Sequence, residues 1–287
     1  MNIPIAQIVA LTCYGNALLQ GIPVGEFFPG NSTCIFCDRV TFVTIKKSFF
    51  WKPKEKEIAG TPDQWFRLLG ASGAIGIRLS RTPQNIPHIS DRMAAGFVGG
   101  GGTWSMEVMF PKNQSAYWVA RWDVWNQNAP EQRIWRVTYG RVSSGATTKP
   151  EPGDLQKTAM RLTQALRDIH SFSMKHDCGV FTQGFADALE TLESGGKNLH
   201  GYHRDLAPKG CLPAPARTIL DACQEAWVFG GMGSWNDMGF DGGDQKEYER
   251  VSDQLFQILN QAIAAAANES GHKSVNRGER GAKHRAP

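Results

Sequence analysis

The chain has 287 residues, of which 41% are hydrophobic and 20% are charged, as in ordinary globular proteins. Its formal net charge of +4 at pH 7 is too small to indicate a nucleic-acid-binding protein. The six cysteines lack the spacing of a secreted disulfide-rich domain, and the apolar N-terminal segment has no basic residue before Arg39, unlike a secretory signal. Since no stretch is long and apolar enough to span a bilayer, we expect a cytoplasmic protein with reduced thiols and no membrane association.

The first half of the chain has the pattern of a β-sheet that follows one helix. Apolar residues predict a buried helix over residues 4–20, ended by Gly21 and Pro23. The charged segment Lys46–Gly60 is expected to form an exposed loop. β-Branched and aromatic residues predict strands at Thr33–Ile45, Ala74–Leu79, Ala94–Val98, Trp104–Phe110, Tyr117–Trp125 and Ile134–Val142. Short turns between these strands, such as that at residues 111–114, favour a mostly antiparallel sheet.

The second half has a helical pattern that starts after the segment Lys149–Gly153, which is rich in helix-breaking residues. Asp154 is the expected N-cap of the first of four helices, and Gly195 ends the second. The third is predicted from Ala216 to Trp227, and a capping box formed by Asp244 and Glu247 is expected to begin the fourth.

Strands followed by helices indicate an α+β fold. We expect an N-terminal helix, a mostly antiparallel sheet over about residues 33–142, and a four-helix C-terminal half packed on that sheet. These elements are expected to form a single domain over residues 1–268, β-rich in 1–148 and helical in 154–268. The polar and basic segment 269–287 is expected to be a disordered tail.

The segment His203-Arg204-Asp205-Leu206 resembles the catalytic loop of protein kinases over four residues. That family has an asparagine four positions after the leucine, where this chain has Gly210. No Asp-Phe-Gly motif follows, and no glycine-rich loop with its lysine strand precedes the segment. We therefore reject a kinase function.

The same segment contains His200, His203 and Asp205, whose imidazole and carboxylate groups are ligands for zinc, iron or manganese. Such spacing needs a turn that directs all three side chains inward. The alternative is a polar loop between helices, because short motif matches of this kind are mostly accidental. No cofactor is expected unless this divalent metal site exists.

Two further motifs favour structural roles. Cys34 and Cys37 have the spacing of half a zinc knuckle, but a second pair is missing. Since both lie in the predicted strand, we expect buried thiols on opposite faces of the sheet. The run Gly99–Gly102 leads into a strand and not into a helix, so we expect a hairpin, bulge or mobile loop instead of a phosphate site.

Two predicted strands combine tryptophan with arginine. Alternation places Trp118 and Trp122 on one face and Arg121 and Trp125 on the other. Aromatic rings beside arginines can stack on bases or sugars or anchor a protein partner. The alternative, favoured for apolar sheet faces, is that the aromatic face packs on the helices while the arginines are solvated. If the first interpretation holds, Trp122, Arg121 and Trp125 are the candidate binding residues.

The segment 229–244 is rich in glycine and lies between two predicted helices. Glycines allow positive φ and close backbone approach, and long glycine-rich loops inside domains are often functional. We take Trp235, Asn236, Asp237 and Asp241 as candidates for binding a cation, a hydroxylated ligand or a basic partner. The alternative is a helix–helix connection with Trp235 buried in the core.

These observations favour a non-enzymatic cytoplasmic protein that acts by binding another macromolecule, such as an accessory or antitoxin-like factor. The expected partner is a protein. An alternative is a metal-assisted hydrolase that uses His200, His203 and Asp205, together with Asp237. A further alternative is a nucleic-acid-binding protein that uses the arginine strands and the basic tail.

Overall fold

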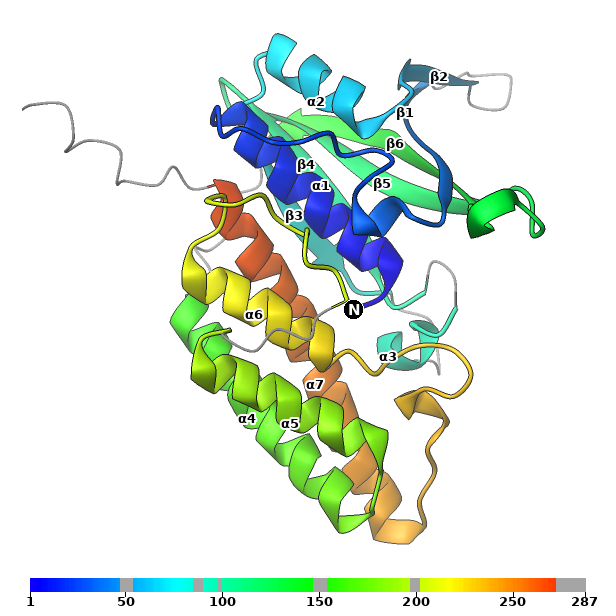
Figure 1. Ribbon diagram of the computed structural model, residues 1–287, viewed down its shortest axis with the longest axis vertical. Helices are drawn as coiled ribbons and strands as arrows, with labels where there is room; N and C mark the ends of the chain where they lie inside the picture. The colour runs from blue at the N-terminus through cyan, green and yellow to red at the C-terminus, as the bar shows by residue number, and fades with distance from the viewer. Residues whose placement is uncertain (47–53, 85–89, 98–99, 147–153, 197–201, 272–287) are drawn as a thin grey trace, which may run out of the picture.

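The computed structural model describes residues 1–46, 54–84, 90–97, 100–146, 154–196 and 202–271. Figure 1 shows an α+β architecture in which α1 and α2 lie on one face of a sheet, while α4–α7 form a separate group of helices in which α7 contacts α1. The predicted fold class is confirmed. The helices are α1 (Ile3–Leu19), α2 (Pro62–Ala71), α3 (Asp91–Ala94), α4 (Leu155–Lys175), α5 (Val180–Ser194), α6 (Ala214–Glu225) and α7 (Gly242–Asn268). Short 3₁₀ turns are η1 (Ser32–Cys34), η2 (Pro130–Gln132), η3 (Trp235–Asp237) and η4 (Glu269–Gly271).

The described strands form a six-stranded mixed sheet in the order β2-β1-β6-β5-β4-β3. Strands β1 and β6 pair in parallel, and all other neighbouring pairs are antiparallel. The mostly antiparallel sheet is therefore as predicted. The strands are β1 (Cys37–Lys46), β2 (Lys54–Ala59), β3 (Gly76–Thr82), β4 (Thr103–Phe110), β5 (Gln114–Val124) and β6 (Trp135–Ala146).

Three segments of the β half differ from the sequence prediction. Lys46–Gly60 was expected to be a loop but contains β2, an edge strand whose charged side chains face solvent and therefore show no apolar alternation. Residues 94–97 do not form the predicted strand, because the preceding Ser90 caps the short helix α3, and Val98 lies outside the described residues. Helix α2 was not predicted, although Thr61 accepts a hydrogen bond from the Gln64 backbone and Pro62 occupies the first helical turn.

Cys34 and Cys37 do not occupy opposite faces of a strand. Asn31 caps η1 by accepting a hydrogen bond from the Thr33 backbone, so that β1 begins only at Cys37. Both sulfurs lie 3.6 Å from Nε2 of Gln7, which is buried in α1. The 3₁₀ turn therefore brings the two buried thiols to the same amide, and the prediction from strand alternation was wrong.

The helical half begins as predicted, but the start of α7 and the end of the chain differ from the prediction. Asp154 caps α4 as expected, since its carboxylate accepts a hydrogen bond from the Lys157 backbone. The predicted capping box of α7 was wrong, because Asp241 is the N-cap and Asp244 instead pairs with Lys175 at 2.7 Å. The expected tail is ordered at Glu269–Gly271, whereas residues 272–287 and the segment Lys149–Gly153 lie outside the described residues.

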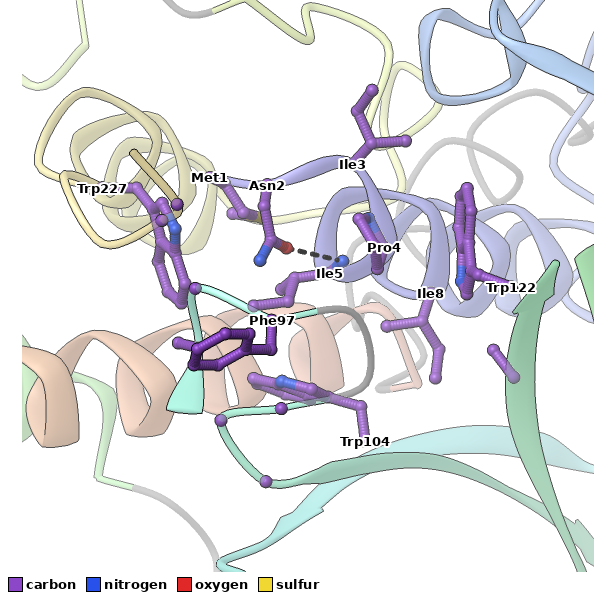
Figure 2. Close-up of a pocket in the computed structure, with 18 of the residues that line it drawn as sticks. Met1, Asn2, Ile3, Pro4, Ile5, Ile8, Phe97, Trp104, Trp122 and Trp227 are labelled. Carbon is purple, nitrogen blue, oxygen red and sulfur yellow. Dashed lines mark hydrogen bonds between the residues drawn. The ribbon is translucent and has the colours of Figure 1, made fainter. Parts of the chain in front are cut away.

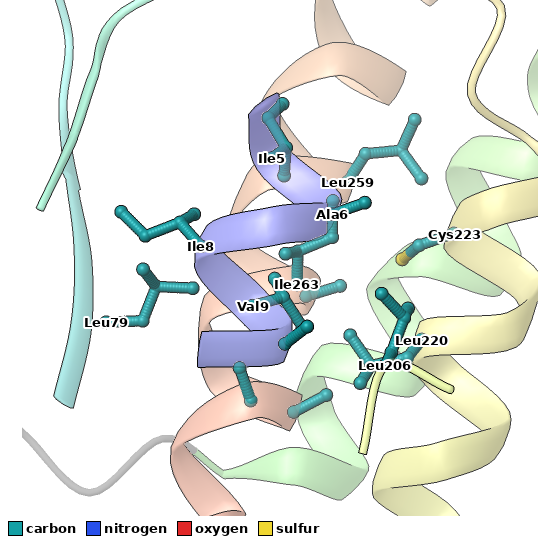
Figure 3. Packing of buried hydrophobic residues seen from close by; sticks show 14 of the residues in the cluster. Ile5, Ala6, Ile8, Val9, Leu79, Leu206, Leu220, Cys223, Leu259 and Ile263 are labelled. Carbon is teal, nitrogen blue, oxygen red and sulfur yellow. The ribbon is translucent and has the colours of Figure 1, made fainter. Parts of the chain in front are cut away.

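Helix α1 is buried along most of its length and connects the two halves of the molecule. Figure 3 shows Ile8 beside Leu79 of β3, while Leu259 and Ile263 of α7 pack against the same helix. Helix α7 also contacts β3 directly, so the helical half meets the sheet at this edge strand. Burial on several sides explains why α1 is apolar without a strong amphipathic period.

The outer edge of β3 is closed by two asparagine side chains instead of a further strand. The Ile77 backbone donates to Oδ1 of Asn16 at 2.7 Å and accepts from Nδ2 of the same residue at 2.8 Å. Leu79 makes the same pair of bonds with Asn268, at 2.7 and 2.9 Å. Each amide mimics the peptide group of a neighbouring strand, so α1 and the end of α7 are fixed to the sheet edge.

We expect Asn16→Leu to lower the free energy of unfolding by about 3 kcal/mol, because it leaves the backbone N–H and C=O of Ile77 buried without partners. Urea unfolding followed by circular dichroism measures the change. The matched control is Asn128→Leu, an exposed position at which we expect a change of less than about 0.5 kcal/mol. Equal stabilities of the two variants would contradict the role of Asn16.

Candidate functional site

A pocket of about 670 Å³ lies where the N-terminal end of α1 meets the sheet. Figure 2 shows Phe97, Trp104 and Trp227 on one side and Trp122 on another, around Ile5 and Ile8 of α1. Four tryptophans line it, one each from β4, β5, β6 and the segment after α6: Trp104, Trp122, Trp135 and Trp227. We call this cavity the tryptophan pocket.

The strand pattern explains why the tryptophans face inward. On β5, Trp122 turns toward α1, while its neighbours Arg121 and Asp123 are exposed on the outer face. On β6, Trp135 follows the same alternation beside Val137, and its ring contacts that of Trp122 edge to face at 6.0 Å. The predicted division of these side chains between two faces of the sheet therefore holds.

Two glycine-rich segments close one end of the tryptophan pocket. The backbones at Gly96 and Gly230 come so close that a Cβ at Gly96 would lie 2.6 Å from the Gly230 carbonyl oxygen. Gly102 has a φ of 97°, and a side chain there would collide with the Arg81 guanidinium. That guanidinium donates from Nε to the Gly101 carbonyl at 3.0 Å and pairs with Asp91. The glycines thus allow a close contact that larger residues would prevent.

The mainly apolar wall also contains the polar side chains of Asn2 and Thr103, the indole N–H of Trp122, and His203, which is 2% exposed. Its Nδ1 lies 2.8 Å from Oγ of Ser32. Asp205 accepts hydrogen bonds from both the backbone and the hydroxyl of Ser32, the former at 2.7 Å. Burial lowers the pKa of His203 to about 4, although the negative charge of Asp205 opposes this shift. The imidazole is therefore neutral at pH 7.

The order of these three groups does not match a nucleophilic triad. In such triads the histidine lies between the serine and the carboxylate and removes the serine proton. Here Ser32 lies in the middle, and its hydroxyl donates to Asp205. His203 is therefore not positioned to activate Ser32 as a nucleophile.

The structure places the predicted metal ligands as follows. His203 and Asp205 lie close together but are joined through Ser32, and His200 lies outside the described residues. Within the part of the chain that the structure describes, no three His, Cys, Asp or Glu side chains are arranged to hold a metal ion. Asp237 lies in η3, where its carboxylate accepts a hydrogen bond from the Gly233 backbone.

The other predicted residues of segment 229–244 stabilise the helical half. Trp235 is fully buried among Phe181, Phe185 and Tyr248, and its Nε1 donates to Ser252 at 2.7 Å. It therefore has no exposed surface to offer a partner. Asn236 bonds with both the side chain and the backbone of Arg92, and Asp241 is exposed at the N-cap of α7.

The predicted residues Arg121 and Trp125 lie on the outer face of the sheet. Arg121 pairs with Glu55 at 2.7 Å and with Asp123 at 2.8 Å. The ring of Trp125 is 41% exposed and is covered in part by the guanidinium of Arg136, 4.2 Å from the ring centroid. These arginines are therefore largely neutralised by neighbours on the same face, and Trp122 lies apart from them.

Sequence reasoning missed most of the pocket. Phe97, Trp104 and Trp227 come from three separate segments, and only tertiary contact brings them together with α1. The available signal was the presence of two glycine-rich segments, each next to aromatic residues, around Gly100 and Gly230. Nothing in their spacing indicated that their backbones touch.

No protein-family model, curated protein or solved structure matches the chain. In the described residues, no helix combines the length and the apolar character that are needed to cross a membrane.

We expect Gly96→Ala to lower the free energy of unfolding by about 2 kcal/mol, because the added methyl group would overlap the Gly230 backbone. Urea unfolding followed by tryptophan fluorescence measures this loss. Gly239→Ala is the matched control, since a Cβ added at Gly239 would have no neighbouring atom within 4 Å. If both variants were as stable as the wild type, the two glycine segments would not be in close contact.

Proposed function

We propose that the protein is a non-catalytic binding protein whose tryptophan pocket holds a neutral, planar and mainly apolar small molecule. The observation that carries this proposal is the convergence of Trp104, Trp122, Trp135 and Trp227 around one open cavity. Its volume of about 670 Å³ lies in the range of ligand pockets, which are mainly apolar with a few polar groups.

The charge of the lining supports a neutral ligand. Among the described residues, no Lys, Arg, Asp or Glu side chain lines the tryptophan pocket, and His203 is uncharged at pH 7. A charged ligand would lose its hydration without gaining a side chain of opposite charge, which is costly.

The rim of the pocket supports an aromatic ligand. Phe97 is 74% exposed and Tyr202 is 67% exposed, and both line the pocket. A planar ligand could bury these rings and make edge-to-face or offset contacts with the tryptophans. This would reduce the apolar area that the free protein exposes.

Titration with 5-fluorobenzothiophene, followed by ¹⁹F NMR, tests this proposal because the probe is neutral, planar and apolar. We expect saturable binding that Trp104→Ala and Trp227→Ala each weaken about tenfold, from loss of ring contacts. Trp125→Ala removes a tryptophan outside the pocket and should leave binding unchanged. Absence of binding, or equal binding by all three variants, would overturn the proposal.

An aromatic group can also be carried by a protein partner, so a fluorotryptophan-containing tripeptide is titrated in parallel. Binding of benzothiophene supports a free small molecule as the occupant. Binding of the tripeptide alone would instead indicate the side chain of a partner and would overturn the small-molecule assignment.

A macromolecular partner on the outer face of the sheet is the second candidate, favoured by the exposed ring of Trp125. The pairing of Arg121 with Glu55 and Asp123 supports a protein partner more than a nucleic acid. Trp125→Ala, but not Trp104→Ala, would weaken the binding of such a partner.

We also propose a cytoplasmic location, which is supported by the six free, buried cysteines.

A further inference from the structure

The contacts of Ser32 determine the tautomer of His203. A serine hydroxyl has one proton, and the close contact between Oγ of Ser32 and Oδ1 of Asp205 places that proton between these two oxygens. Oγ must then accept from His203, whose Nδ1 lies 2.8 Å away. Nδ1 of the neutral imidazole therefore carries the proton, and Nε2 carries a free lone pair.

The free nitrogen has no partner within the described protein. No hydrogen bond joins Nε2 of His203 to any of the described residues, so its lone pair can accept one from a bound molecule. His203 itself lines the tryptophan pocket. The ring of the adjacent Tyr202 meets the imidazole edge to face at 4.9 Å and also lines the pocket.

The histidine is held in place from its backbone as well as from its ring. The His203 N–H donates to Oε1 of Gln224 at 2.9 Å, and Nε2 of Gln224 donates back to the His203 carbonyl at 3.2 Å. Gln224 belongs to α6 and is buried. Support from both sides gives a preorganised acceptor, which is the usual condition for a specific contact.

We propose that Nε2 of His203 accepts a hydrogen bond from an N–H or O–H group of the bound ligand. The ligands of the tryptophan pocket are then neutral aromatic molecules with a hydrogen-bond donor, of the indole or phenol class. This inference rests on the proposed function and adds one polar group that selects among planar ligands. A site that hydrogen-bonds its ligand discriminates against analogues without the donor, since the buried acceptor is then left unpaired.

The test compares 5-fluoroindole with 5-fluorobenzothiophene, which have similar shapes but differ in the N–H donor. In the wild type, we expect the indole to bind roughly two- to tenfold more tightly than the benzothiophene, the effect of one neutral hydrogen bond. His203→Phe should abolish this preference while benzothiophene still binds. His170→Phe replaces a histidine outside the pocket and should retain the preference.

A second measurement on the wild type does not depend on the folding of a variant. With ¹⁵N-labelled histidine, NMR is expected to show His203 protonated at Nδ1 and unprotonated at Nε2. Addition of 5-fluoroindole should shift the Nε2 resonance, and addition of 5-fluorobenzothiophene should not. Protonation at Nε2 in the free protein would overturn the inference.

The outcomes separate this inference from the proposed function. If both probes bind equally, and Trp104→Ala weakens both, then the pocket binds planar ligands and only the role of His203 is overturned. If neither probe binds, both proposals are overturned. A preference for the indole that persists in a folded His203→Phe variant would assign the donor contact to another group and would also overturn the inference.

Discussion

The arrangement of the whole molecule depends on how the outer edge of β3 is closed. Asn16 and Asn268 hydrogen-bond to Ile77 and Leu79 in the way that a neighbouring strand would. These bonds satisfy backbone groups that would otherwise be buried without partners, and they fix α1 and α7 against the sheet. The helical half can then pack on the outer side of α1, as Figure 3 shows.

The tryptophan pocket follows from this placement of α1. The helix covers the inner face of the sheet, but its first turn leaves space between the inward-facing tryptophans and the segment after α6. Close contact between Gly96 and Gly230 closes one end of that space. Hydrogen bonds with Ser32 and Gln224 orient His203 in the wall. The pocket is thus built by elements from both halves of the chain.

The sequence predicted those features that depend on neighbours along the chain. Asp154 as an N-cap and the alternation that separates Trp122 from Arg121 are local patterns, and both are present. The start of β1 was mistaken because a cap at Asn31 outweighs strand propensity. The link between Ser32 and His203 joins residues 171 positions apart, so no spacing rule could indicate it. Trp235 is buried among three helices that are distant in the sequence, so the sequence alone left two alternatives for it, a binding role and burial in the core.

The central claim is that the tryptophan pocket binds a neutral aromatic molecule that donates a hydrogen bond to His203. A crystal structure of the protein with saturating 5-fluoroindole tests it most directly. We predict that the bound ring lies in the tryptophan pocket, with its N–H within hydrogen-bond distance of Nε2 of His203. Indole bound only elsewhere on the protein, or oriented in the pocket with its N–H away from His203, would contradict it.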